Sequence, residues 1–147
     1  MSDLDAFAKL VPLDHGLVVV STTRADGTVQ SSVVNAGVLP HPVRGTPVVA
    51  FVAAGSSQRL RNLRARPRAT IVLRAGWQWA GVEGPVELAG PDDALAGIDD
   101  ERRRVLLREI FEAAGGTHDD WDEYDRVMAD DRRVAVLLDP DRTFGPA

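Results

Sequence analysis

The sequence predicts one mainly β domain, a small barrel of six or so largely antiparallel strands with flanking helices. Six short segments are rich in β-branched residues with polar and apolar positions interleaved, which is typical of strands. Most of these segments follow one another through short links, and short links join antiparallel neighbours. Because the 147 residues contain no repeat or linker-like tract, we expect residues 1–147 to form a single domain.

The predicted strands are residues 17–23, 28–38, 48–53, 69–73, 77–88 and 133–138. The first two form a hairpin around the Asp26-Gly27 turn. The fifth contains Gly81 and Gly84-Pro85, where we expect it to bend. Residues 40–47 carry three prolines and are predicted to form a loop.

The predicted helices are residues 4–11, a short segment from Ser57 to before Pro67, residues 103–114, and a segment that follows Thr117. Ser2 or Asp3 is the expected cap of the first helix, Ser56 or Ser57 that of the second, and Thr117 that of the last. The side chains expected to face inward are Leu60, Leu63, Val105, Leu106, Ile110, Phe111, Trp121, Tyr124 and Met128.

Composition excludes several classes of protein. No apolar run approaches the roughly 18 residues that span a bilayer, and the acidic N-terminus has the wrong sign for a targeting peptide. The absence of cysteine excludes thiolate nucleophiles and cysteine-bound metals. The net charge of −5 argues against nucleic acid as a partner. We therefore expect a soluble cytoplasmic protein that binds neither membranes nor nucleic acid.

Positive charge is concentrated in residues 55–76, which contain six arginines and no acidic residue. The rest of the chain therefore carries −11. Such a segment indicates either a specific anionic ligand or a solvated basic face, because the chain uses arginine sixteen times and lysine once.

The start of this segment is the strongest candidate for a binding site. Small residues before a helix expose backbone N–H groups, and nearby hydroxyls and arginines can add a clamp on phosphate. The same residues also fit an ordinary capped helix with arginines facing solvent. The residues concerned are Ser56, Ser57, Gln58, Arg59, Arg61 and Asn62.

Two further features carry open alternatives. Trp77 and Trp79 would point to one face of a strand, as core, as a dimer interface or as the wall of a slot for a planar ligand. The three histidines lie singly in loop-like contexts and are predicted to be surface residues, so no metal site is expected. They are His15, His41 and His118.

Three stretches carry a resemblance to a known family. They are residues 17–23 with Asp26-Gly27 and residues 30–35; residues 57–69 with Gly76-Trp77 and residues 82–84; and residues 118–124 with residues 131–134. Together they resemble the split β-barrel flavin and deazaflavin oxidoreductases, which include pyridoxamine-phosphate oxidase. Within that family the chain is most similar to the actinobacterial branch that uses the deazaflavin cofactor F420.

The resemblance implies a homodimer with two cofactor sites along its interface. It implies hydride transfer from reduced F420 to a conjugated small molecule, for example a tetrapyrrole such as biliverdin. Arg59 stands where relatives often have a lysine, and Ser57 where some have a basic residue. The implied cofactor-binding residues are Thr22, Ser32, Val33, Ser56, Ser57, Gln58, Arg59, Arg61, Asn62, Trp77 and Gln78.

Other functions remain open at this point. One is an FMN-dependent oxidase or flavin reductase of the same fold, since a phosphate pocket suits both cofactors. Another is a non-catalytic protein that binds a flavin, F420 or a tetrapyrrole, and a third is an interaction domain without a small ligand. No general acid is identified, and His118 and Tyr124 are the only candidates.

Overall fold

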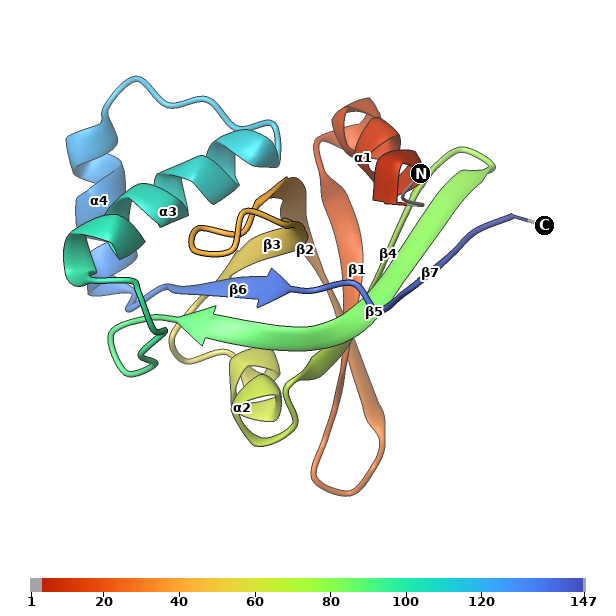
Figure 1. Cartoon of the computed structure of the whole chain (residues 1–147), viewed down its shortest axis with the longest axis horizontal. Coiled ribbons are helices and arrows are strands. Elements are labelled where there is room, and N and C mark those ends of the chain that lie inside the picture. Colours follow the sequence, from red (N-terminus) through yellow and green to blue (C-terminus); the bar gives the residue numbers. More distant parts are fainter. Residues whose placement is uncertain (1–3, 147) are drawn as a thin grey trace.

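The computed structural model describes residues 4–146 and shows a closed barrel of six antiparallel strands with helices around it (Figure 1). The strands are β1 (Leu17–Thr23), β2 (Val29–Pro40), β3 (Pro47–Ala53), β4 (Arg68–Ala75), β5 (Gln78–Ala89) and β6 (Val134–Leu138). Around the barrel they follow the order β4-β1-β2-β3-β6-β5, and β5 closes on β4. This confirms the predicted fold class. A three-residue strand that was not predicted, β7 (Arg142–Phe144), pairs with β5.

Two long strands connect the halves of the barrel. Residues 29–35 of β2 pair with β1, and residues 36–40 pair with β3. In the same way β5 leaves β4 after Pro85 and pairs with β6 from Val86 onward, which confirms the predicted bend. At Gly37 of β2, a Cβ atom would lie 2.3 Å from the Ala113 backbone, so only glycine permits this close approach.

The helices are α1 (Leu4–Leu10), α2 (Gln58–Ala65), α3 (Asp100–Ala113) and α4 (Trp121–Asp130), with a 3₁₀ turn at Val11–Asp14. In Figure 1, α3 and α4 lie together on one side of the barrel, while α1 and α2 lie at separate positions. No helix within residues 4–146 is long and apolar enough to cross a bilayer. The residues expected to cap α1 lie outside the described residues.

Two helix starts differ from the prediction. Helix α3 begins three residues early, at Asp100, because the Asp99 carboxylate accepts a hydrogen bond from the Arg102 N–H at 2.7 Å. The cap of α4 is Asp120 rather than Thr117, since its carboxylate accepts from the Glu123 N–H at 3.1 Å. In both cases an aspartate next to the first turn satisfies an otherwise unpaired donor.

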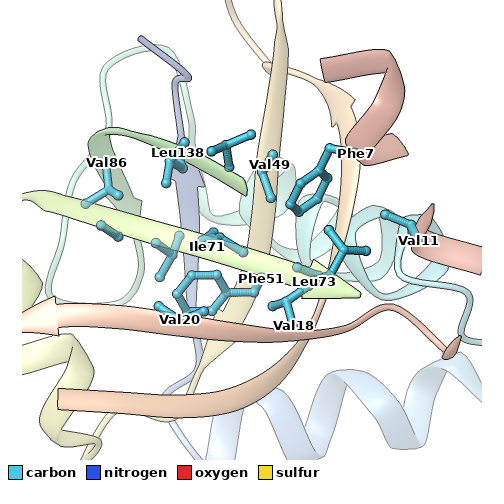
Figure 2. Close-up of a cluster of buried hydrophobic side chains, with 14 of the residues drawn as sticks. Phe7, Val11, Val18, Val20, Val49, Phe51, Ile71, Leu73, Val86 and Leu138 are labelled. Carbon is cyan, nitrogen blue, oxygen red and sulfur yellow. The ribbon is translucent and has the colours of Figure 1, made fainter. Parts of the chain in front are cut away.

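Strand β3 is buried on both faces and separates two hydrophobic layers. Val49 and Phe51 belong to the barrel interior, whereas Val48 and Ala50 pack in the layer that contains α3 and α4. Figure 2 shows the interior layer, where Phe51 lies near Ile71. Each fully buried side chain of this size contributes about 1.5–3 kcal/mol. On α3, Leu107 is buried, whereas the predicted inward residues Val105 and Phe111 are half-buried.

His41 is buried, contrary to the prediction of a surface histidine. Its Nδ1 accepts hydrogen bonds from the Val43 and Arg44 N–H groups at 3.1 Å, so Nε2 carries the proton toward Glu87 Oε1 at 3.0 Å. The Arg44 guanidinium, followed by His41, holds the pKa of Glu87 below its ordinary value, despite partial burial. The imidazole therefore organises the loop after β2.

Candidate functional site

Helix α2 closes one end of the barrel. Leu60 and Leu63 are fully buried in the interior layer, which fixes the orientation of the helix. The Ser57 hydroxyl accepts a hydrogen bond from the Leu60 N–H at 3.4 Å, which confirms the predicted cap. Two polar residues of α2, Arg59 and Asn62, form hydrogen bonds with side chains of the β1–β2 hairpin.

Asn62 joins α2 to that hairpin. Its side chain is 1% exposed and its Nδ2 donates to Thr22 Oγ1 at 3.0 Å and to Gln30 Oε1 at 3.1 Å. Its Oδ1 accepts from Gln58 Nε2 at 2.9 Å. All polar atoms of the amide are thereby engaged, and the Thr22 hydroxyl is turned toward Asn62 inside the barrel mouth. Asn62 holds the helix in place.

Arg59 lies one turn earlier on α2, and only one of its guanidinium nitrogens donates a hydrogen bond among the described residues. Its Nε donates to Ser32 Oγ at 3.0 Å, and no carboxylate within residues 4–146 forms an ion pair with it. Burial, and secondarily the charge of Arg133, lowers the pKa of the Arg59 guanidinium. An arginine nevertheless stays protonated in proteins, so a half-buried positive charge remains without a counter-ion. Its two Nη groups are available to an anion.

Arginines without an acidic partner gather around this residue. Ten of the sixteen arginines form ion pairs among the described residues. Four of the other six lie on α2, just after it or on the hairpin, and we call them the α2 arginine patch: Arg24, Arg59, Arg61 and Arg66. Backbone carbonyls hold three of them, for example the Thr23 carbonyl, which accepts from Arg66 Nε at 2.7 Å. The patch is therefore ordered and positively charged.

The turn before α2 opens into a hollow of about 520 Å³ that also contains acidic residues. Ser56 lines it together with Asp130 and Asp131, and the Gly55 N–H donates to the Asp131 carbonyl at 3.1 Å. Part of the turn that was expected to bind an anion thus already forms a hydrogen bond with the α4–β6 connection. The face of α2 that carries Arg59 is better suited to an anion than the turn itself.

A large groove covers the outer surface of β1, β2 and β4, with a volume of about 820 Å³. Its lining is mostly apolar, and Trp77 and Val33 in it are 97% and 62% exposed. We call it the outer groove, and its lining is Asp14, Leu17, Val18, Val19, Val33, Val72, Leu73, Arg74, Gly76, Trp77 and Trp79. Trp77 lies in the turn before β5 rather than in the strand, yet it lines the same groove as Trp79.

Strand β2 connects the patch with the groove. Ser32 receives the hydrogen bond of Arg59, while Val33, the next residue, lies in the outer groove on the opposite face of the strand. Over residues 29–35, β2 pairs with β1 and with no other strand of the described chain. One edge of β2 therefore presents backbone N–H and C=O groups to a ligand, between the arginines and the groove.

The structure divides the predicted binding residues into sets. Asn62 bonds Thr22, and Arg59 bonds Ser32, between α2 and the hairpin. Ser57, Gln58 and Arg61 form hydrogen bonds within α2 and the turn before it. Ser56 precedes this group in the acidic hollow, while Val33 and Trp77 lie in the outer groove. Gln78 is exposed at the start of β5 and lines neither.

The two candidate proton donors are held by internal contacts. The Tyr124 hydroxyl donates to the Leu107 carbonyl at 2.9 Å, and burial raises the pKa of Tyr124 to about 12. His118 Nδ1 accepts from the Asp120 N–H at 2.9 Å, and its ring packs against Trp121 and Phe111. The inward face predicted for α4 is confirmed, and neither side chain is placed as a proton donor.

Some residues of interest were missed from the sequence. Arg133 lies close enough to Arg59 to affect its pKa, although 74 positions separate them in the chain. The pairing of β3 with β6 and the hydrogen bond from the Gly55 N–H to the Asp131 carbonyl bring these two parts of the chain together. No pattern in the sequence marks such a contact. Among residues 4–146, no group of three histidine or acidic side chains could hold a metal ion.

Comparison with known proteins places this arrangement among solved structures. No protein-family model matches the chain. A conserved hypothetical protein of Mycobacterium tuberculosis is 19% identical with a TM-score of 0.69, covering 99% of this chain and 84% of that one. An F420 reductase is 17% identical with a TM-score of 0.59, covering 87% and 88% of the two chains.

A third similar structure is a pyridoxamine 5'-phosphate oxidase-related, FMN binding protein of Nostoc punctiforme. It is 13% identical with a TM-score of 0.63, and the match covers 97% of this chain and 84% of that one. At these identities the likeness concerns the fold. The chain has the split β-barrel fold of the pyridoxamine-phosphate-oxidase-like proteins, as its sequence resemblance predicted. This fold is shared by solved proteins whose names refer to FMN or F420.

Proposed function

We propose that the protein is an oxidoreductase that binds F420 and transfers a hydride from its reduced form to a conjugated small molecule. The observation that carries this proposal is the α2 arginine patch beside the outer groove, on the two faces of β2. F420 combines a flat ring system with a phosphate and an acidic glutamyl tail. FMN shares the ring and the phosphate but has no acidic tail, so arginines beyond Arg59 favour F420.

The residues present fit such a ligand. The free Nη groups of Arg59 would hold the phosphate, and Arg61, Arg24 and Arg66 would attract the acidic tail. Val33 and the Trp77 indole would contact the plane of the ring, and the open edge of β2 would bond its polar rim. This assignment uses the donors that internal contacts leave available.

When bound, reduced F420 supplies the hydride, and the chain positions the reactants. The apolar lining of the outer groove would exclude water from one side of the ring, which favours hydride transfer between aligned partners. Because Tyr124 and His118 are held by internal contacts, the proton that accompanies the hydride would come from water. The volume of the groove, about 820 Å³, suits a planar multi-ring substrate such as biliverdin.

We also propose that the active form is a homodimer with cofactor sites along its interface. Monomeric proteins rarely expose a contiguous apolar patch larger than a few hundred Å². The outer groove exposes Leu17, Val19, Val33 and Trp77, and Leu13 is exposed nearby in the chain. A second copy over this face would shield the indole and form the other wall of the cofactor site.

The proposal is tested by replacing Arg59. We expect Arg59→Ala to weaken F420 binding by about 1.5–3 kcal/mol, roughly 10- to 150-fold, because a charged hydrogen bond to phosphate is lost. Binding is measured by fluorescence titration, and turnover by the oxidation of reduced F420 with biliverdin as the first acceptor.

Arg126→Ala is the matched control, since Arg126 is exposed on α4 and has no acidic partner among the described residues. It should bind and react as the parent protein does. An Arg59→Ala protein that folds normally and binds F420 as tightly as the parent would remove this residue from the site and contradict the proposal.

A further inference from the structure

A separate cavity lies between α3, α4 and the outer side of the barrel, with a volume of about 190 Å³. We call it the α3–α4 cavity. Its walls are mostly apolar and include Val52 of β3, Ile110 and Ala114 at the end of α3, and Met128 of α4. None of the predicted binding residues lines it. In Figure 1, α3 and α4 lie side by side on this side of the barrel.

The cavity contains one cationic side chain, Arg133. Its Nη2 and Nε lie 3.3 and 3.4 Å from the same oxygen of Asp131, at the long limit of a hydrogen bond. Asp131 is the only carboxylate of the described chain that forms an ion pair with Arg133. Arg59, which forms no ion pair among residues 4–146, lies close enough to Arg133 for the two positive charges to repel.

The other charged groups around the cavity do not neutralise Arg133. Asp125 on α4 is bound by Arg108, with Nη2 and Nε as donors, and by Arg104 at 2.7 Å. The Tyr124 hydroxyl donates a hydrogen bond to the Leu107 carbonyl and carries no charge near neutral pH. Asn35 uses one N–H on the His15 carbonyl at 2.7 Å and retains the other. Arg133 and Asn35 therefore retain N–H donors at this cavity that suit an anion.

Size and polarity limit what can enter. An apolar cavity of about 150 Å³ accommodates benzene, so about 190 Å³ admits one ring with a small substituent. A phosphate group would be poorly matched, because most of its oxygens would face apolar walls. A carboxylate places its two oxygens on one guanidinium and leaves its apolar part in contact with Val52, Ile110 and Met128.

We propose that the α3–α4 cavity binds a small carboxylate whose apolar part is a single ring or a branched chain of similar size, with Arg133 as its anchor. Asn35 and Val33 lie on the same face of β2, about 7 Å apart, so the cavity and the outer groove flank one stretch of strand. The cavity would then recognise an acidic side arm of the substrate, and this role in the reaction rests on the proposed function.

Binding is tested on the cofactor-free protein by calorimetric titration with sodium benzoate and with benzamide at constant ionic strength. Benzamide has nearly the same shape but no charge. We expect benzoate to bind at least about tenfold more tightly than benzamide. Arg133→Gln should abolish the preference for benzoate over benzamide. Arg126→Gln, on the exposed face of α4, should retain it.

A second variant keeps the test independent of the arginine. Ala114→Leu adds side-chain volume inside the cavity and should abolish binding of both probes with Arg133 intact. The proposal is overturned if benzoate binds no better than benzamide, or if both probes bind Ala114→Leu as they bind the parent. Because no F420 is present, failure here leaves the cofactor proposal standing, and the reverse also holds.

Discussion

Asn62 and Arg59 lie one turn apart on α2 and have opposite environments. The amide of Asn62 is buried with every polar atom bonded, so it contributes to the stability of the fold. The guanidinium of Arg59 is half-buried without a carboxylate partner in the described chain, so it costs stability. A charged side chain that lowers the stability of the folded protein and lies beside a groove is a good candidate for a functional residue.

Replacing Asn62 by alanine should destabilise the protein by about 1–3 kcal/mol, because the Thr22 hydroxyl and the Gln30 amide oxygen lose their donor. Urea denaturation measures the change. The exposed Arg61→Ala serves as the control and should stay within about 0.5 kcal/mol of the parent protein. Equal stability of Asn62→Ala and the parent would show that the amide is not the link between α2 and the hairpin.

At the scale of elements, one carboxylate ties α4 to α3. Asp125 on α4 accepts hydrogen bonds from Arg108 and Arg104 of α3, which hold the pKa of Asp125 below its ordinary value. The interaction therefore stabilises the packing of the helix pair that forms the α3–α4 cavity. Its contribution depends on pH, since it requires an ionised carboxylate.

We expect Asp125→Asn to destabilise the protein by about 1 kcal/mol at neutral pH. Because the folded pKa of Asp125 lies below its unfolded value, the stabilisation is complete above about pH 4 and is lost as the pH falls through the folded value. The stability gap between parent and variant should therefore shrink below about pH 4. A gap that stays constant across urea titrations at several pH values would contradict this account, and Asp130→Asn is the exposed control.

The elements could be predicted largely because their signals are local. The Asp26-Gly27 turn, the Ser57 cap and the bend near Pro85 each depend on a few neighbouring residues, and all three are present. The cap of α4 was misassigned because Thr117 and Asp120 are both good caps, and only tertiary packing selects between them. The buried state of His41 depends on Glu87, which lies 46 positions away.

The candidate site was predictable only in part, because it also depends on contacts between residues far apart in the chain. The resemblance implied that Thr22 and Ser32 bind the cofactor, and the structure shows that the hydroxyls of both form hydrogen bonds with residues of α2. Arg59 was identified by local charge, whereas Arg133 comes close to Arg59 through tertiary contacts such as the pairing of β3 with β6. Sequence patterns do not encode contacts of this range.

At the scale of the whole molecule, the outer groove leaves large apolar side chains exposed. If a second copy covers it, Trp77→Glu should convert a dimer into a monomer, because a charge would be buried at the interface. Light scattering after size-exclusion chromatography measures the mass. Val127→Glu, an exposed apolar position on α4 outside the groove, should remain dimeric. A parent protein that is monomeric at every concentration would contradict the proposed assembly.

The cofactor assignment is best tested by a fluorescence titration of the cofactor-free protein with F420 and with FMN, side by side at one salt concentration. We predict that F420 binds clearly more tightly than FMN, because the α2 arginine patch offers more positive charge than one phosphate requires. Tighter binding of FMN would contradict the deazaflavin assignment and favour a flavin enzyme. Binding of neither would contradict both cofactor proposals and leave only the barrel itself.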